Sequence, residues 1–375
     1  MNATNIKIEF VNTDEALVLL AQKLQQLTEF SFDTEFDRFW REYGFKLLLI
    51  QIYDGDTCYL LDPLAIKNFK PLWDVFEDKN ICKIAYASSE DIQLLKINNC
   101  FTKNIFDVQI AAKLCNHPGN SFGDLVADIC KTTIDKSLQR SNWRTRPLPL
   151  EQQVYASNDV IWLPQLKNYF DKIIVENNVI EIIATENKDC ENIPVAAYEV
   201  KLSNKQHSRY SKYYKEVLLS LLILRDEVAA AYNMPPFMIF TDALMEEIVE
   251  NPAPFLAKPF EKGFSSKFRF NEDYTNAFLN TIKNIDTSIP FEAVKKERPI
   301  QTEKDKTYYP SKDEIDNKCK SIHSIVTAEY GIIAGEFIVR GLKKALQAKP
   351  YKEVNLKNYQ MEIINKACGE LGIEL

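Results

Sequence analysis

The sequence has few of the features that mark an exported, membrane-bound or thiolate-based metalloprotein. Its longest dense apolar run, VLLSLLIL at 217–224, is far shorter than the roughly 20 residues needed to cross a bilayer. The first 20 residues lack a basic stretch followed by an apolar one, so we expect no export signal and a location in the cytoplasm. The eight cysteines include no C-x-x-C pair, which favours reduced thiols over a disulfide framework or a zinc ribbon.

Histidine is also scarce, with three residues spread widely along the chain. Carboxylates must therefore carry most of any metal chemistry. The chain has 53 acidic residues against 46 Lys and Arg, a net charge of -7. Residues 1–190 hold 27 acids against 20 basic residues, while residues 191–375 hold 26 of each. This balance argues mildly against generic coating of nucleic acid and assigns the acidic excess to the first half.

The first half of the chain alternates strand-like and helix-like patterns. With 375 residues, 46% of them apolar, the chain is long enough for two or three domains. Apolar runs predict consecutive strands within residues 30–62, and spacings of three and four predict helices between residues 69 and 178. We expect an α/β domain with a mixed central sheet over residues 1–205. The stretch 185–212 loses apolar periodicity, which predicts an irregular connection.

Strand signals largely vanish in the second half. Helical patterns interrupted by proline pairs predict a small all-α domain at residues 206–290. The polar stretch 291–310 predicts a linker, and residues 311–375 predict a further helical domain.

Two acids stand in the strand-like stretch SFDTEFDRFW, at Asp33 and Glu35. Residues i and i+2 of a strand point to the same face, so the two carboxylates would lie side by side. Like charges about 4 Å apart repel by about 4 kcal/mol at an effective dielectric of about 20, and a divalent cation would remove this cost. The alternative is a chance D-x-E pattern in which one charge points to solvent.

Three further residues could act with this pair of acids: Asp91, Tyr155 and Asp159. Asp91 ends the S-x-x-D pattern that begins at Ser88, so it is either a functional acid or a capping residue at a helix start. Tyr155 and Asp159 are four residues apart in a helical pattern and would share one helix face. An ordinary structural hydrogen bond between them is the alternative.

Together these five residues occur in the order D-x-E, D, Y-x-x-x-D, and in this the sequence resembles the DEDDy branch of the ribonuclease D family of 3'-to-5' exonucleases. The resemblance covers most of residues 28–170. It includes GFKLLLIQIYDGDTCYLLDPL at 44–64, IFDVQIAAKLC at 105–115 and DKSLQRSNWRTRPLPLEQQVYASNDVIWLPQL at 135–166. It implies a ribonuclease H-like exonuclease domain.

The resemblance also implies a catalytic site. Two divalent cations, Mg²⁺ or Mn²⁺, would be bound by four carboxylates: Asp33, Glu35, Asp91 and Asp159. In such sites one cation activates a water and the other stabilises the leaving oxygen. Tyr155 would orient the attacking water, since an unperturbed tyrosine is a poor base, and Phe36 would wedge against the terminal base.

Two positions depart from the family pattern. Tyr86 stands where many relatives have histidine, and Asn142 stands where they often have aspartate. Neither departure removes an expected metal ligand. They put details of substrate contacts and helix capping in doubt, and leave the expected reaction intact.

A basic segment precedes the last motif. Residues 131–147 carry five Lys and Arg against one acid, with Trp143 interleaved. Basic side chains neutralise phosphates while an aromatic ring stacks on a base, so we expect Arg140, Arg144 and Arg146 to contact the nucleic acid. For Trp143 the alternative is a place in the core.

The helical second half resembles the helicase and ribonuclease D C-terminal (HRDC) domain. The sequence LLILRDEVAAAYNMPPFMIFTDALMEEIVENPAPF at 221–255 carries the match, and residues 311–375 resemble a second, diverged copy. The resemblance implies a part in holding nucleic acid. The balanced charge of this half leaves a spacer or protein-contact role open.

We therefore expect a metal-dependent 3'-to-5' exoribonuclease that releases 5'-mononucleotides. The family resemblance implies that its substrates are the single-stranded 3' ends of tRNA-like and other structured RNA. We expect no obligate protein partner and no membrane association. Two alternatives stay open. Since no sequence feature reads a 2'-hydroxyl, the substrate could be DNA; a nucleic-acid-binding protein with a decayed site is the other alternative, although all five motif residues are present.

Overall fold

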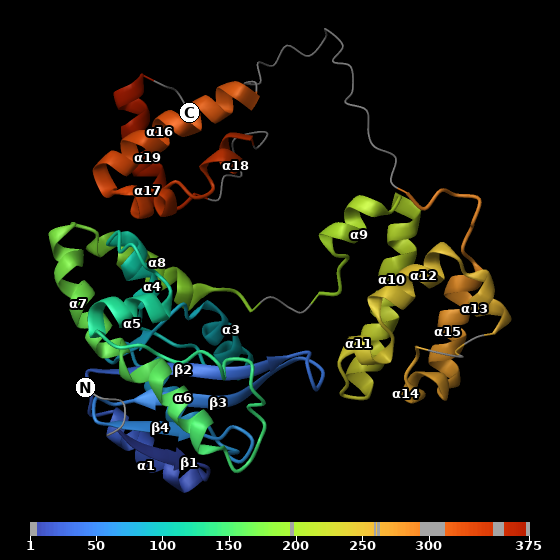
Figure 1. Ribbon diagram of the computed structural model, residues 1–375, viewed down its shortest axis with the longest axis horizontal. Helices are drawn as coiled ribbons and strands as arrows, with labels where there is room; N and C mark the ends of the chain where they lie inside the picture. The colour runs from blue at the N-terminus through green and yellow to red at the C-terminus, as the bar shows by residue number, and fades with distance from the viewer. Residues whose placement is uncertain are drawn as a thin grey trace. The chain divides into compact units, whose positions relative to one another are not determined.

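The computed structural model describes residues 6–195, 199–258, 260, 263–292, 312–347 and 356–372. They divide into two compact units (Figure 1). Unit 1 holds the sheet with helices α1–α8 and the C-terminal helices α16–α19, and unit 2 holds residues 36–46 and helices α9–α15. Apart from Phe291 and Glu292, the expected linker at 291–310 lies outside the described residues.

Unit 1 is built around a mixed six-stranded sheet, as the sequence predicts. The strands are β1 (Lys7–Val11), β2 (Glu29–Arg38), β3 (Phe45–Tyr53), β4 (Thr57–Leu61), β5 (Cys82–Ala85) and β6 (Ile105–Asp107), in the spatial order β1-β4-β3-β2-β5-β6. β3 and β4 pair antiparallel, whereas β1–β4, β2–β5 and β5–β6 pair parallel. Figure 1 shows β2, β3, β4 and β1 side by side in this order. Because β2 has a neighbour on each side, the acids that it carries sit on an internal strand.

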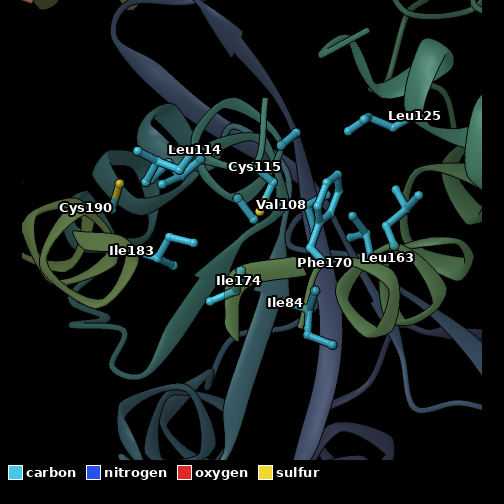
Figure 2. Packing of buried hydrophobic residues seen from close by; sticks show 14 of the residues in the cluster. Ile84, Val108, Leu114, Cys115, Leu125, Leu163, Phe170, Ile174, Ile183 and Cys190 are labelled. Carbon is cyan, nitrogen blue, oxygen red and sulfur yellow. The ribbon is translucent and has the colours of Figure 1, made fainter. Parts of the chain in front are cut away.

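The helices of the α/β region pack with the sheet around one apolar core. They are α1 (Asp14–Leu24), α2 (Lys70–Glu77), α3 (Ser89–Ile97), α4 (Val108–Leu114), α5 (Phe122–Cys130), α6 (Leu150–Ile161), α7 (Leu163–Glu176) and α8 (Ile180–Asn192). Phe170 of α7 lies near Ile84, Val108 and Leu163 in this core (Figure 2). The predicted helical stretch that ends at residue 178 is interrupted at Trp162, and Pro164 stands in the first turn of the next helix.

The prediction of an irregular connection from residue 185 is wrong as far as Asn192, because α8 continues to that residue. Its inner face is mixed. It buries Ile182, Ile183 and Cys190 together with the polar residues Glu186, Asn187 and Glu191. Asn187 accepts a hydrogen bond from the backbone of β6, and Glu191 accepts one from the loop before it. Polar groups that are buried and hydrogen-bonded interrupt the apolar stripe from which a helix is recognised in a sequence.

The C-terminal region is helical, as expected, and it packs within unit 1. Its helices are α16 (Lys312–Tyr330), α17 (Ile332–Ile338), α18 (Leu342–Gln347) and α19 (Asn358–Leu371). The Asn116 side chain, just after α4, accepts hydrogen bonds of 3.0 Å from the backbone of Ile333 and Ala334 and donates one to the Tyr330 carbonyl. These bonds join the start of α17 to the α/β region.

Unit 2 is helical beyond residue 203. The sequence predicts this for the helices from residue 212 on, whereas α9 lies in the stretch 185–212, for which the sequence predicts an irregular connection. Its helices are α9 (Asn204–Arg209), α10 (Lys212–Ala231), α11 (Pro236–Ile239), α12 (Asp242–Glu250), α13 (Ala253–Ala257), α14 (Ser266–Arg269) and α15 (Glu272–Lys283). Four phenylalanine rings pack at centroid distances of 5.3 to 5.8 Å in its core: Phe240, Phe264, Phe268 and Phe278. The buried Arg225 donates to the Phe240 carbonyl and to Asp242.

Within the parts of the chain that are described, no helix combines the length and apolar character required to cross a membrane.

Candidate active site

Three of the predicted acids converge on one point. Asp33 and Glu35 come from β2, and Asp159 comes from α6. One carboxylate oxygen of each lies within 4.8 Å of the others. All three side chains are half-buried. The strand periodicity that predicts a shared face for Asp33 and Glu35 therefore holds, and α6 adds the third carboxylate from about 125 residues further along the chain.

Asp91 lies beside this three-acid group and is not a member of it. It stands in the first turn of α3, is 7% exposed and accepts a hydrogen bond from the Thr34 hydroxyl. Its charge is one of the causes of the raised pKa of Asp33. A capping box is absent, because Ser88 makes no side-chain cap hydrogen bond, although Asp91 does occupy the first helical turn as the alternative expects.

The electrostatics of the acids are unfavourable without a cation. Burial, and then the charges of Asp91, Asp159 and Glu35, raise the pKa of Asp33 well above its ordinary value. Burial and two neighbouring carboxylates do the same to the pKa of Glu35, and burial raises the pKa of Asp159. Each shift reflects a carboxylate that is costly to ionise where it stands. A divalent cation suits this donor set, because hard oxygen ligands match hard cations and their negative charge would be compensated.

Tyr155 lies on the same helix as Asp159, four residues earlier. Its ring packs at a tilt against Trp143, with the centroids 5.8 Å apart. Burial, and then the charges of Asp159 and Glu35, raise the pKa of the Tyr155 hydroxyl. At neutral pH the hydroxyl therefore stays protonated, which suits it to orienting a water and not to removing a proton.

Arg146 does not have the predicted role. Its Nε and Nη2 atoms each donate a 2.7 Å hydrogen bond to the carboxylate of Asp62. Its remaining donors reach the carbonyls of Trp143 at 2.7 Å, Thr145 at 2.9 Å and Leu48 at 2.8 Å. The expectation of a phosphate contact at Arg146 is wrong, because all five donors of its guanidinium are already used inside the protein.

The other predicted substrate contacts differ in exposure. Arg140 is exposed and Arg144 is half-buried. Phe36 is half-buried with its ring edge-on to Phe45 at 4.7 Å. For Trp143 the core alternative is the one found, since its side chain is buried.

The two departures from the family pattern both make structural contacts. The Tyr86 hydroxyl donates to the Asn120 carbonyl at 2.6 Å and accepts from the Gln109 amide at 3.0 Å. The Asn142 side chain accepts from the backbone N–H of Arg144 at 3.3 Å. Tyr86 therefore joins segments that are distant in the sequence, whereas the Asn142 bond closes a local turn.

Two polar residues near the acids were missed by sequence reasoning. Thr34 is buried between Asp33 and Glu35 and donates to Asp91. Asp107 is buried at the start of α4 and accepts hydrogen bonds from the turn before α3. Strand alternation already predicts that Thr34 points away from the two acids. Only the tertiary structure identifies Asp91 as its partner.

Comparison with known proteins agrees with this geometry. Residues 8–175 match the family described as 3'-5' exonuclease, and residues 215–258 match the HRDC domain. The chain is 38% identical over 160 residues to ribonuclease D of Shewanella sp. (strain ANA-3) and 32% identical over 194 residues to ribonuclease D of Escherichia coli (strain K12). These alignments cover 42% and 51% of this chain, and 41% and 51% of the relatives. The chain thus spans about half the length of the curated relatives, or less.

Solved structures extend the likeness in fold. The crystal structure of Escherichia coli RNase D, described as an exoribonuclease involved in structured RNA processing, superposes with a TM-score of 0.70 at 22% identity and covers 97% of this chain and 99% of that one. The catalytic core of RRP6 from Trypanosoma brucei gives a TM-score of 0.66 at 20% identity, covering 76% of this chain and 81% of that one. At these identities the likeness concerns the fold.

Residues 8–175 therefore combine the acid site with a match to the 3'-5' exonuclease family, and an HRDC match follows at residues 215–258. Over the matched region the chain is similar to proteins named ribonuclease D.

Proposed function

We propose that this protein is a cytoplasmic, metal-dependent 3'-to-5' exoribonuclease that releases 5'-mononucleotides. The observation that carries the proposal is the convergence of Asp33, Glu35 and Asp159 within 4.8 Å, with Asp91 beside them. The curated relatives named ribonuclease D support RNA as the substrate. The structured RNA processing attributed to the Escherichia coli enzyme supports the single-stranded 3' ends of tRNA-like and other structured RNA.

Four carboxylates would hold two divalent cations, Mg²⁺ or Mn²⁺: Asp33, Glu35, Asp91 and Asp159. When bound, such cations activate a water and stabilise the charge on the leaving oxygen. The chain's own residues do the positioning. Tyr155 holds the attacking water through its protonated hydroxyl, and Phe36, which directly follows Glu35, packs against the terminal base.

The same proposal assigns the phosphate contacts and the domains. Arg140 and Arg144 contact phosphates of the strand, with Arg146 excluded for the reason given above. Residues 1–205 form the exonuclease domain, 206–290 the HRDC-like domain and 311–375 a second, diverged HRDC-like domain. The family match at 215–258 supports the middle assignment.

Labelled RNA tests the reaction. The full chain is incubated with single-stranded RNA labelled at its 5' end, with Mg²⁺ or Mn²⁺, beside the Asp33→Ala variant. We expect stepwise shortening from the 3' end and 5'-mononucleotide products. The variant should be slower by at least about 10³-fold, because removing a ligand removes the transition-state stabilisation that the metal supplies.

Two arms of the same experiment address the alternatives. A matched single-stranded DNA oligomer that is degraded faster than the RNA would reverse the substrate assignment. RNA binding without shortening, equal in both proteins, would instead show a nucleic-acid-binding protein with a decayed site.

A further inference from the structure

We propose that Thr34 is a positioning residue that orients the Asp91 carboxylate towards the metal site, on a backbone held in place by Asp107. The inference rests on the proposed function, since it assumes that Asp91 contributes to binding a divalent cation. It concerns residues that do not belong to the acid set itself.

Asp91 needs orientation more than the other acids do. One carboxylate oxygen each of Asp33, Glu35 and Asp159 lies within 4.8 Å of the other two, whereas Asp91 is outside that group. It comes from the first turn of a different element, α3. A carboxylate that reaches a site from its edge loses binding energy if it is free to rotate, because only one orientation presents an oxygen to the cation.

The Thr34 hydroxyl supplies that orientation. Thr34 is 4% exposed and donates to Oδ1 of the 7% exposed Asp91. A hydrogen bond to one oxygen fixes the rotation of the carboxylate about its Cβ–Cγ bond. Removing a partner of this kind typically weakens metal affinity by about 10- to 100-fold. Thr34 lies between two of the acids in β2. The strand that provides Asp33 and Glu35 therefore also locks the fourth carboxylate.

Asp107 fixes the backbone from which Asp91 projects. Its Oδ1 atom accepts from the Ala87 N–H at 3.0 Å, and its Oδ2 atom accepts from the Ser88 N–H at 2.8 Å and the Ser88 hydroxyl at 3.1 Å. Ala87 has a left-handed backbone with φ of 52°, a conformation that non-glycine residues adopt only when their surroundings hold it. The turn before α3 is thus pinned three residues ahead of Asp91.

Asp107 is itself anchored on two sides. It caps α4 by accepting from the backbone of Gln109 at 2.8 Å, and its own N–H donates to Asn187 of α8 at 3.2 Å. The turn that presents Asp91 is therefore connected to β6, α4 and α8. Movement of Asp91 is restricted to its side chain, which is the part that Thr34 holds.

Isothermal titration with Mn²⁺ in the absence of RNA tests the proposal on the full chain. Thr34→Val keeps the shape of the side chain and removes the hydroxyl, while Thr34→Ser keeps the hydroxyl. We expect the Mn²⁺ dissociation constant of Thr34→Val to rise by about 10-fold and that of Thr34→Ser to stay within about 2-fold of wild type. With RNA, the kcat of Thr34→Val should fall while its KM stays close to wild type, because the RNA contacts are unchanged.

A double-mutant cycle separates positioning from a general loss of packing. If Thr34 acts through Asp91, adding Thr34→Val to Asp91→Asn changes Mn²⁺ affinity no further. The proposal is overturned if Thr34→Val binds Mn²⁺ as wild type does, if Thr34→Ser is equally impaired, or if the effect of Thr34→Val persists in the Asp91→Asn background. Should Thr34→Val fail to fold, Thr34→Ala is compared with Thr34→Ser under the same criteria. A wild-type protein that binds no Mn²⁺ would overturn the proposed function as well, so the two failures are distinguishable.

Discussion

At the scale of single residues, the clustered acids that would bind cations destabilise the metal-free protein. Asp33 is the clearest case, because burial and three like charges all favour its protonated form. A carboxylate whose pKa is higher in the folded state than in the unfolded state binds its proton more tightly when folded. Its contribution to stability is fully present below the unfolded pKa, near 4, and is lost as the pH rises through the folded pKa.

Asp33→Asn should therefore stabilise the protein when no metal is present. In EDTA at pH 8 we expect the free energy of unfolding to rise, because the substitution removes a buried carboxylate that is costly to ionise. At pH 5 the gain should be smaller, because the wild-type side chain is then more fully protonated. Urea unfolding at the two pH values measures the effect. Asp128→Asn, at an exposed acid of α5, is the matched control and should change little; an identical pH dependence in Asp33→Asn and wild type would contradict the argument.

At the scale of elements, the attachment of α17 to the α/β region depends on one glycine. Gly331 has a φ of +87°, and a Cβ atom built on it would lie 2.4 Å from the Asn116 side chain. The same Asn116 side chain caps the first turn of α17. Side chains at Gly331 are therefore excluded twice, by backbone conformation and by the close approach of Asn116.

Gly331→Ala is expected to destabilise unit 1 by at least about 2 kcal/mol, combining the cost of a positive φ with the loss of a helix cap. Gly369→Ala is the matched control in the neighbouring helix α19, where a Cβ atom would meet nothing within 4 Å. It should be neutral or stabilising by about 0.5–1 kcal/mol. Thermal unfolding measures both, and hydrogen exchange should locate the loss at the amides of Ile333 and Ala334. Equal effects of the two substitutions would show that Asn116 does not hold α17 in this way.

At the scale of the whole molecule, the predicted metal ligands all belong to unit 1. Three come from β2 and α6, and the fourth comes from α3. Unit 2 has its own aromatic core around Phe240. A ligand that binds only the folded form of one unit stabilises that unit by mass action and leaves the intrinsic stability of a separate core unchanged.

Mn²⁺ at 100 times its dissociation constant should stabilise unit 1 by about 2.7 kcal/mol. Hydrogen exchange followed by mass spectrometry should show new protection in β2, α3 and α6 and little change in α10 and α15. The Asp33→Ala variant serves as the control, in which the protection of unit 1 should largely disappear. Protection that rises equally in α10 would indicate a metal site elsewhere in the chain.

Much of the local structure follows from the sequence alone. Alternation predicts β2 and the shared face of Asp33 and Glu35, and helical spacing predicts α3, α5 and the common face of Tyr155 and Asp159. These features depend on neighbours two to four residues apart, which is the range that a sequence pattern reports directly. Helical spacing and the HRDC resemblance likewise predict the helical character of unit 2, which helices α10–α15 confirm.

Only the tertiary structure decided which distant groups meet. It brought Asp159 to Asp33 and Glu35 but left Asp91 at the edge, held by Thr34. It also turned Arg146 inward onto Asp62. The physical reason is that a charged side chain has several possible partners of similar chemistry, and a sequence records the chemistry without the distance. Packing of the sheet and its helices selects one of these partners. That selection decides whether an arginine can contact phosphate or is bound to another residue of the protein, as Arg146 is.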